Sequence, residues 1–271
     1  MKNPLYQYLS DGVSFISHTA TQIRTIYAPL CGIDAQGLKS SISPFLSGDI
    51  KIDKHHYLTK PVSTEDLRHP VRNFFVYIDG QGMFSLAEPA KNDAASVEVG
   101  QLWHKVARWH KAVGLAMQGV NFIPVTGETI ELMRVTLKNI GQRKLKITPT
   151  AFVPIFGRAL ANKHDHEHVT SLLQRIEQIP QGVLAEPTML FNEHGHKVNR
   201  TRYYVLGRTD KGEAPAGTFP TARSFYGEGG TCFAPEAVIK DFTPEVLPPE
   251  ALDGQEAAGA LRFKKISLRS G

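Results

Sequence analysis

The most regular alternation of apolar and polar residues lies near the middle of the chain. Met133, Val135 and Leu137 are separated by polar residues, so a strand here would have one apolar face and one hydrated face. Residues 139–143 interrupt the alternation, and a second alternating run follows at Lys144–Thr148. Two such runs joined by a short polar turn predict a β-hairpin.

Short apolar segments separated by turn residues recur along most of the chain. The aromatic and β-branched residues of Phe74–Ile78 favour a strand, and Asp79–Gly82 has the composition of a turn. We expect further strands at residues 14–16, 23–27, 83–86, from 97 onward, and at 113–117, 120–125, 183–191, 202–206 and 258–268. Strands about 8–12 residues apart with turns between them indicate an all-β sandwich.

One segment departs from the β pattern. Val169, Leu172, Leu173 and Ile176 follow the spacing of one helical face, which predicts a short helix that ends before Pro180.

The alternating strand pattern is weak in the first 70 residues and regular after them, which divides the chain into two parts. Residues 1–70 predict an N-terminal extension and the first strands of the sandwich, with a loop at 57–70. Residues 71–271 predict the body of the sandwich. Within it, residues 208–230 carry Gly and Pro and predict a long loop, a kind of segment that is often functional in compact domains.

The composition fits a folded globular chain. Its 271 residues are 41% hydrophobic and 21% charged, which argues against disorder. The net charge of +5 comes from scattered cations, and the densest basic stretch, residues 138–146, falls on the expected hairpin turn. We therefore expect no nucleic-acid partner.

Neither a membrane segment nor a secretion signal is expected. No apolar run is long enough to span a bilayer, and Met1–Phe15 has no apolar core of a leader, so we expect no membrane partner and a cytoplasmic location. Cys31 and Cys232 permit one disulfide, but two buried thiols are favoured.

Four segments, in order, resemble a known family. They are "IELMRVTLKNIGQRKLKITPTAFVPIFG", "KHDHEHVTSLLQRI", "PTMLFNEHGHKVNRTRYYV", and "FPTARSFYGEGG" followed by "EAAGALRFKKISL". Together they resemble the N-terminal β-sandwich of glycoside hydrolase family 94, which contains cellobiose phosphorylase, 1,2-β-oligoglucan phosphorylase and the phosphorylase domain of cyclic β-1,2-glucan synthase. The second and third segments look most like the 1,2-β-oligoglucan phosphorylases.

The resemblance implies a fold and an activity. The fold would be a large antiparallel supersandwich of the galactose-mutarotase type. The full enzyme would phosphorolyse β-linked, and by subgroup β-1,2-linked, glucooligosaccharides with inversion and release α-glucose 1-phosphate. Inorganic phosphate would be a co-substrate, with no cofactor and no metal, and it would replace the water and base of an inverting hydrolase.

The resemblance also implies partners. In the family, the catalytic Asp and the phosphate-binding residues lie in an (α/α)₆ barrel that follows the sandwich. We therefore expect no catalytic residue in residues 1–271, no activity from this chain alone, a downstream helical barrel as partner, and a possible homodimer.

The late loop would lie on the sugar-acceptor side of the barrel pocket. The family stretch resembles "DRESFLGPYRG", and Ser224, Phe225 and Gly227 match it. Gly229-Gly230 replaces the Tyr-Arg pair, so the acceptor contact is either lost or moved to Arg223 or Glu228. The substrate-binding residues implied are Arg223, Phe225, Tyr226 and Glu228.

Three other groups of residues suggest chemistry, and each has a simpler interpretation. The histidines of His164–His168 could bind a metal, but a polar loop before the helix is favoured. Glu193 and His194 could act as an acid/base pair, but a turn at Gly195 is favoured. Aromatic residues could stack on sugars; core packing is favoured for Tyr203 and Tyr204, and a surface position for Trp109, with Trp103 also considered.

Two pairs of carboxylates are close in sequence, Asp165 with Glu167 and Glu128 with Glu131. They give no reason to expect a glycosidase pair, whose members must flank a bond.

Two alternatives to the phosphorylase module remain open. One is a stand-alone carbohydrate-binding or scaffold sandwich, and the weaker one is an aldose epimerase that uses His194.

Overall fold

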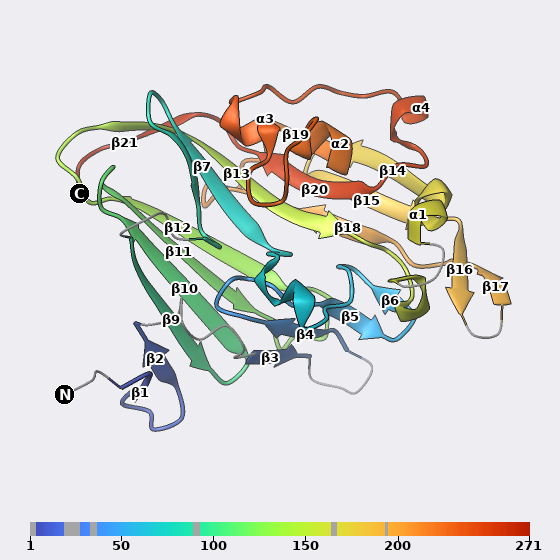
Figure 1. Cartoon of the computed structure of the whole chain (residues 1–271), viewed down its shortest axis with the longest axis horizontal. Coiled ribbons are helices and arrows are strands. Elements are labelled where there is room, and N and C mark those ends of the chain that lie inside the picture. Colours follow the sequence, from blue (N-terminus) through green and yellow to red (C-terminus); the bar gives the residue numbers. More distant parts are fainter. Residues whose placement is uncertain (1–3, 19–27, 33–36, 89–92, 164–166, 193–194) are drawn as a thin grey trace.

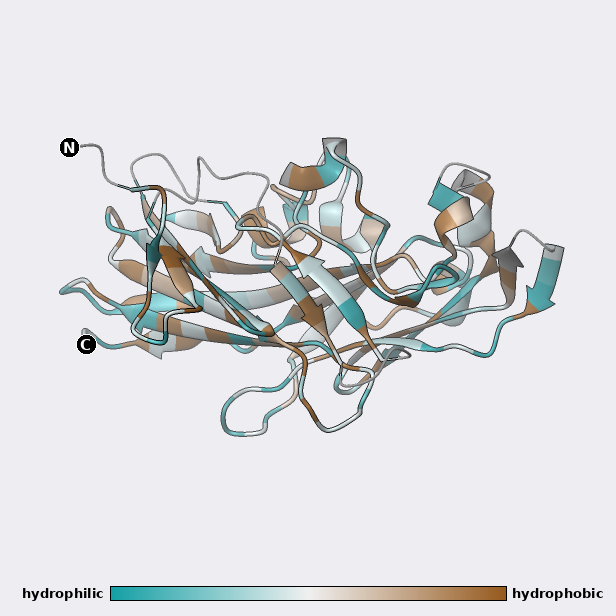
Figure 2. Cartoon of the chain, turned by 90° about the horizontal axis from the view of Figure 1, so that it is seen from below, coloured by the Kyte–Doolittle hydropathy of each residue, from teal (hydrophilic) through white to brown (hydrophobic). Residues whose placement is uncertain are grey.

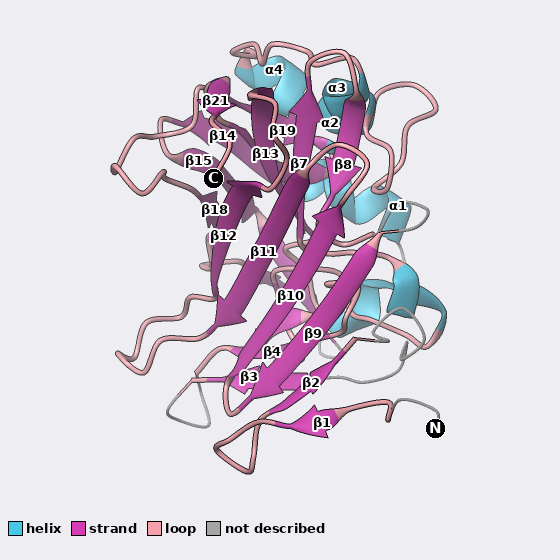
Figure 3. Ribbon diagram, turned by 90° about the vertical axis from the view of Figure 1, so that its left-hand side faces the viewer, coloured by secondary structure: helices cyan, strands magenta, loops and turns pink. Residues whose placement is uncertain are grey.

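The computed structural model describes residues 4–18, 28–32, 37–88, 93–163, 167–192 and 195–271. The expected all-β fold with a few short helices is confirmed (Figure 1). A six-stranded antiparallel sheet forms one layer (Figure 3) and has the strand order β1 (Gln7–Tyr8), β2 (Phe15–Ser17), β9 (Ala94–Gly100), β10 (Trp103–His110), β11 (Leu115–Phe122) and β12 (Leu132–Asn139).

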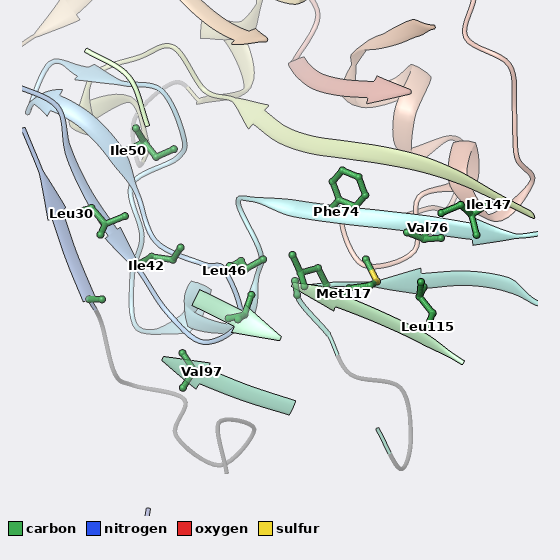
Figure 4. Packing of buried hydrophobic residues seen from close by; sticks show 14 of the residues in the cluster. Leu30, Ile42, Leu46, Ile50, Phe74, Val76, Val97, Leu115, Met117 and Ile147 are labelled. Carbon is green, nitrogen blue, oxygen red and sulfur yellow. The ribbon is translucent and has the colours of Figure 1, made fainter. Parts of the chain in front are cut away.

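A second six-stranded sheet forms the opposing layer. Its order is β19 (Gly217–Thr221), β20 (Ala257–Arg262), β13 (Leu145–Ile155), β7 (Asn73–Ile78) and β8 (Gly82–Ser85), and β21 (Ile266–Leu268) also pairs with β13. Buried side chains from both sheets, among them Val76 and Ile147 from one and Leu115 and Met117 from the other, form one apolar cluster (Figure 4). Figure 2 shows apolar and polar residues alternating along the strands, as a half-buried sheet requires.

Smaller sheets extend the sandwich. One has the order β3 (Ala28–Cys31), β4 (Lys39–Ile42), β5 (Ile50–Asp53) and β6 (His56–Tyr57). Another has the order β14 (Gln174–Ile179), β15 (Gly182–Pro187) and β18 (Tyr203–Leu206). β16 (Met189–Asn192) and β17 (Gly195–Val198) form a two-stranded sheet. Leu30, Ile42 and Ile50 of the β3–β6 sheet belong to the same buried cluster as Val76. The β3–β6 sheet and the sandwich body therefore share one core.

The helices are all short. They are η1 (Glu65–Arg68), η2 (Leu160–Lys163), α1 (Glu167–Thr170), η3 (Ser171–Leu173), α2 (Ala222–Tyr226), α3 (Glu236–Ile239) and α4 (Pro249–Leu252). Within the described residues, none has the length and apolar character needed to cross a membrane. α2 and α3 contact the second sheet, and α2 contributes to the lining of the candidate site.

The predicted hairpin, with strands at residues 128–139 and from 144 onward, is wrong. β12 and β13 have the expected alternation, but β12 pairs with β11 and β13 pairs with β7 and β20, in different sheets. The connecting turn instead bonds to the β10–β11 turn, since the amide of Ile140 donates to the carbonyl of Gly114 at 2.8 Å. Gly114 has a φ of 71° and lies against Gly141, where a side chain would collide with backbone.

The predicted helix at residues 169–176 is only partly present. The helical turns end at Leu173, and β14 begins at Gln174. The amide of the Gln174 side chain donates to the carbonyl of Phe156 at 2.8 Å, which holds the chain in the sandwich at this point. Leu172 is exposed, so the apolar spacing did not mark a buried face.

Three further boundaries differ from the predictions. The strands predicted at 113–117 and 120–125 form one strand, β11, that continues through Gly119. The missing side chain of Gly119 leaves room for Leu86 of the opposing layer. The predicted loop at 208–230 contains β19 and α2, and the predicted strand at 258–268 is split into β20 and β21. The strand predicted at 23–27 lies outside the described residues.

The two cysteines are free, but they are not both buried. Cys31 is exposed and Cys232 is partly buried. The expectation of a buried thiol is therefore wrong for Cys31, which lies at the end of the short strand β3 with its side chain outward.

Several polar side chains are buried along β10 and beside it. His104, Arg108 and His110 alternate along β10 and are almost fully buried. Arg72 is also buried, and its Nε and Nη2 atoms donate to the carboxylate of Glu131 at 2.5 and 2.9 Å. Among the described residues, neither ring nitrogen of His104 has a hydrogen-bond partner.

We predict that acid destabilises the fold through His104. Burial, and then the charges of Arg72 and Arg108, lower the pKa of His104 from 6.5 to about 3. A pKa depressed on folding contributes stability above the unfolded pKa, and this stability is lost as the pH falls from 6.5 towards 3. The expected loss is about 1.4 kcal/mol per pH unit, or about 2 kcal/mol between pH 6.5 and 5.

Urea unfolding of the wild-type chain and of His104→Gln across this pH range tests the prediction. Burial shifts the pKa of His110 in the same direction, so the difference between the two proteins isolates His104. Parallel pH profiles for the two proteins would show that His104 does not carry the effect.

Candidate functional site

The helix α2 organises the segment that contains the predicted binding residues. Thr221 caps the helix, because its Oγ1 accepts a hydrogen bond from the amide of Ser224 at 3.0 Å. The Ser224 Oγ accepts one from the amide of Thr221 at 3.1 Å, which completes a capping box. Gly227 ends the helix with a φ of 73°, a conformation that favours glycine.

The four predicted binding residues lie in different environments. Arg223 and Glu228 are exposed, and Tyr226 is partly buried. Phe225 is fully buried and stacks on Phe152 with a centroid distance of 4.6 Å. Phe225 therefore anchors α2 to the sheet, and its ring is not accessible to a ligand in this structure.

An open groove of about 540 Å³ lies beside α2. Its polar lining comes from α2 and from the segment that contains α4, and its apolar lining from Leu247 and Ala251. The lining residues are Thr221, Arg223, Ser224, Leu247, Glu250, Ala251 and Gln255. A groove with a few convergent polar groups and an apolar wall suits a polyhydroxylated ligand such as a sugar, which has hydroxyl groups and apolar C–H faces.

Glu250 and Gln255 were not among the residues predicted from the sequence. They lie more than 25 residues beyond Arg223, and no local motif marks them. The only sequence signal in this part is Pro248-Pro249, which begins α4. The fold brings them to α2 because the carbonyl of Glu256 accepts from the amide of Ala222 at 2.8 Å.

A buried arginine pairs with Glu256, the residue whose carbonyl bonds to the start of α2. Arg158 is 4% exposed, and its Nη2 lies 2.8 Å from the carboxylate of Glu256, which remains half exposed. Among the described residues, the Nε and Nη1 atoms of Arg158 have no hydrogen-bond partner. Arg158 and Glu256 therefore connect the segments where β13 ends and β20 begins.

The partly buried side chains near α2 are neutral at physiological pH. Burial raises the pKa of the Cys232 thiol to about 11 and also raises the pKa of the Tyr226 phenol. The thiolate and phenolate forms that would act as nucleophiles are therefore rare. Neither group is therefore activated as a nucleophile by its surroundings.

The other residues singled out from the sequence are not brought together. His164 to His166, Glu193 and His194 lie outside the described residues, so the metal and acid/base interpretations are not tested there. Among the described residues, no cluster of three His, Cys, Asp or Glu side chains could hold a metal ion. Glu128 is exposed whereas Glu131 pairs with the buried Arg72, so these two carboxylates have separate environments.

The aromatic residues follow the strand alternation. Tyr203 is buried, as expected for core packing, but Tyr204 is 45% exposed, so the core prediction is wrong for Tyr204. The side chains of Trp103 and Trp109 are half-buried on the outer face of β10. Trp109 is therefore only partly at the surface.

Comparison with known proteins adds no family. Neither a protein-family model nor a curated protein matches the chain.

Proposed function

We propose that the chain is the β-sandwich module of an inverting glycoside phosphorylase that acts on β-1,2-linked glucooligosaccharides. The groove beside α2 would bind the acceptor side of the substrate. The catalytic acid and the phosphate-binding residues would belong to an (α/α)₆ barrel, with inorganic phosphate as co-substrate and α-glucose 1-phosphate as product. The observation that carries the proposal is Arg223, which lines the groove in the segment that resembles the family's acceptor loop.

The groove lining supports a role in sugar binding. Arg223 can only donate hydrogen bonds, the Glu250 carboxylate can only accept them, and Gln255 can do both. Sugar hydroxyls donate and accept, so such a set can bind two or three adjacent hydroxyl groups.

The test is phosphorolysis by the gene product with all of its domains. Incubation with β-1,2-linked glucooligosaccharides and inorganic phosphate should release α-glucose 1-phosphate, measured by a coupled enzymatic assay. Release from cellobiose alone would change the linkage, and no release from any β-glucan would contradict the phosphorylase.

The groove also favours a second candidate function, a stand-alone carbohydrate-binding module, because its donors, acceptors and apolar side chains could bind a glucan without catalysis. This candidate predicts glucan binding by residues 1–271 without phosphorolysis by the whole gene product.

We predict that Arg223→Ala weakens glucan binding to residues 1–271. A hydrogen bond to a charged group contributes about 1.5–3 kcal/mol, so the dissociation constant should rise by about tenfold or more. Isothermal titration calorimetry with β-1,2-linked glucooligosaccharides measures the change. Arg200→Ala is the matched control, because Arg200 is also exposed but does not line the groove, and it should bind as wild type. Equal loss in both variants would remove Arg223 from the site.

A further inference from the structure

Two basic runs that are far apart in the sequence lie side by side in the structure. The first run contains Lys138, Arg143, Lys144 and Lys146, all exposed, on the connection between β12 and β13. No Asp or Glu occurs between residues 132 and 164. In the sequence this run alone suggested only an ordinary charged turn.

The second run comes from the C-terminal strand and has the exposed cations Lys264, Lys265 and Arg269. β21 pairs with the start of β13, with Leu268 opposite Leu145 and Ser267 opposite Lys146. Figure 1 shows β21 and the C-terminus at the same end of the molecule as the β12–β13 turn. We call the surface formed by these two runs the basic end.

The tail and the turn are fixed to each other. The side-chain amide of Asn139 donates to the carbonyls of Arg143 and Leu268 at 2.7 and 3.0 Å, so one residue bonds both runs. The hydroxyl of Ser270 donates to the carbonyl of Gly141 at 2.9 Å. The cations are therefore carried on a defined surface and not on two independent segments.

The basic end has a large charge excess. It has seven exposed cations, and the carboxylates that bond to it, Asp79 and Asp241, both contact the same one, Lys265, at 2.8 and 3.1 Å. Seven cations less two carboxylates give +5, the net formal charge of the entire chain. The like charges repel each other in the free protein, and an anionic partner would relieve this repulsion.

Two features favour a lipid surface over a nucleic acid. Ile140 and Ile266 lie among the cations and are 42% and 43% exposed, and an apolar side chain at such a position gains by entering the interfacial region of a bilayer. A hollow of about 290 Å³ opens between Asp79, Gln81, Lys144 and Lys146. The Asp79 carboxylate is paired with Lys265, so a phosphate with a polar headgroup would meet the two lysines and Gln81. Nucleic-acid phosphates would use the cations but not the isoleucines.

We propose that the basic end docks on a membrane surface that contains anionic phospholipids, with the chain bound peripherally, which departs from the expectation of no membrane partner drawn from the sequence. Each cation near such a surface contributes about a fivefold change in the binding constant. Binding should therefore be strong only to anionic membranes, and it should weaken as salt screens the charges.

Vesicle co-sedimentation tests the proposal with residues 1–271. The probes are vesicles of phosphatidylcholine alone and of phosphatidylcholine and phosphatidylglycerol in equal parts, at low and high salt. Binding is expected only to the vesicles with phosphatidylglycerol and should decrease with salt. Lys144→Glu with Lys146→Glu should lower it by at least about 25-fold. Lys197→Glu with Lys211→Glu, at exposed sites outside the basic end, is the matched control and should retain most of it.

A second pair of variants distinguishes lipid from other polyanions. Ile140→Ser with Ile266→Ser should weaken vesicle binding and leave any binding to duplex DNA unchanged. The proposal is overturned if wild type binds neither vesicle, if it binds neutral vesicles equally well, if both charge-reversal pairs weaken binding to the same extent, or if the isoleucine variants bind vesicles as wild type does. The last result together with tight DNA binding would assign the basic end to nucleic acid instead.

Discussion

Replacing Phe225 by alanine should destabilise the fold by about 3–5 kcal/mol, the range expected when a buried aromatic side chain is removed and leaves a cavity. Phe225 is fully buried, and its ring meets those of Phe75, Phe152 and Phe219 at centroid distances of 6.1, 4.6 and 6.1 Å. These rings come from three strands of one sheet, which have limited freedom to close the cavity.

The loss should be visible in both stability and binding. Urea unfolding followed by tryptophan fluorescence measures the free energy of unfolding. Because Phe225 anchors α2, its removal should also weaken any glucan binding that depends on Arg223, under conditions where the chain is still folded. Phe242→Ala is the control, since Phe242 is 44% exposed, and it should change stability by less than about 1 kcal/mol. Similar losses in the two variants would show that the aromatic cluster does not determine stability at this site.

The position of Phe225 shows which part of the candidate site the sequence can predict and which part it cannot. The resemblance placed Phe225 in a binding loop, and the Thr221 and Ser224 of the same segment are the residues of a capping box. That local signal could have predicted a short helix, and a helix of five residues must bury a side chain to be stable. Whether the buried side chain is Phe225 or Tyr226 depends on the sheet beneath, which the local sequence does not describe.

The strands were predictable because their alternation is local, but their partners were not. β12 and β13 show the period of two that would be expected for a hairpin, and the same period occurs when a chain crosses from one sheet to the other. The difference is made by a distant contact, the close approach of Gly114 and Gly141. The same limitation separated the two halves of the basic end, which only the pairing of β13 with β21 brings together.

Charged residues in the core were the least predictable part of the fold. Arg108 lies in a stretch of Lys, His and Trp that resembles a surface strand, yet its guanidinium is buried and donates to the carbonyls of Pro44 and Ala87 at 2.9 and 3.2 Å. The alternation with Val106 does indicate that Arg108 points inward. The charged residue type nevertheless favours the surface in a sequence-based prediction. A buried cation needs hydrogen-bond partners, and here these partners are remote in the chain, so the local sequence does not show them.

The ion pair between Arg72 and Glu131 leads to the second large prediction. Both side chains are almost fully buried, at 1% and 5% exposure, and Asn121 also donates to the carboxylate of Glu131 at 3.0 Å. Glu131→Leu should lower the free energy of unfolding by about 3–5 kcal/mol, because it leaves the charge of Arg72 buried without its partner. The orphaned Arg72 would retain only its hydrogen bond to Ser40 among the contacts described.

The double variant Arg72→Met with Glu131→Leu distinguishes charge from packing. If the cost of Glu131→Leu comes from an unpaired buried cation, removing that cation should restore most of the lost stability, since an apolar pair of similar volume can replace a buried ion pair at little cost. The double variant should then be more stable than Glu131→Leu alone, with a coupling energy above about 1 kcal/mol in the four-protein cycle. Additive losses would instead mean that each side chain stabilises the core through its own packing. The buried pair of Arg72 and Glu131 would then be two independent contacts and not one coupled ion pair.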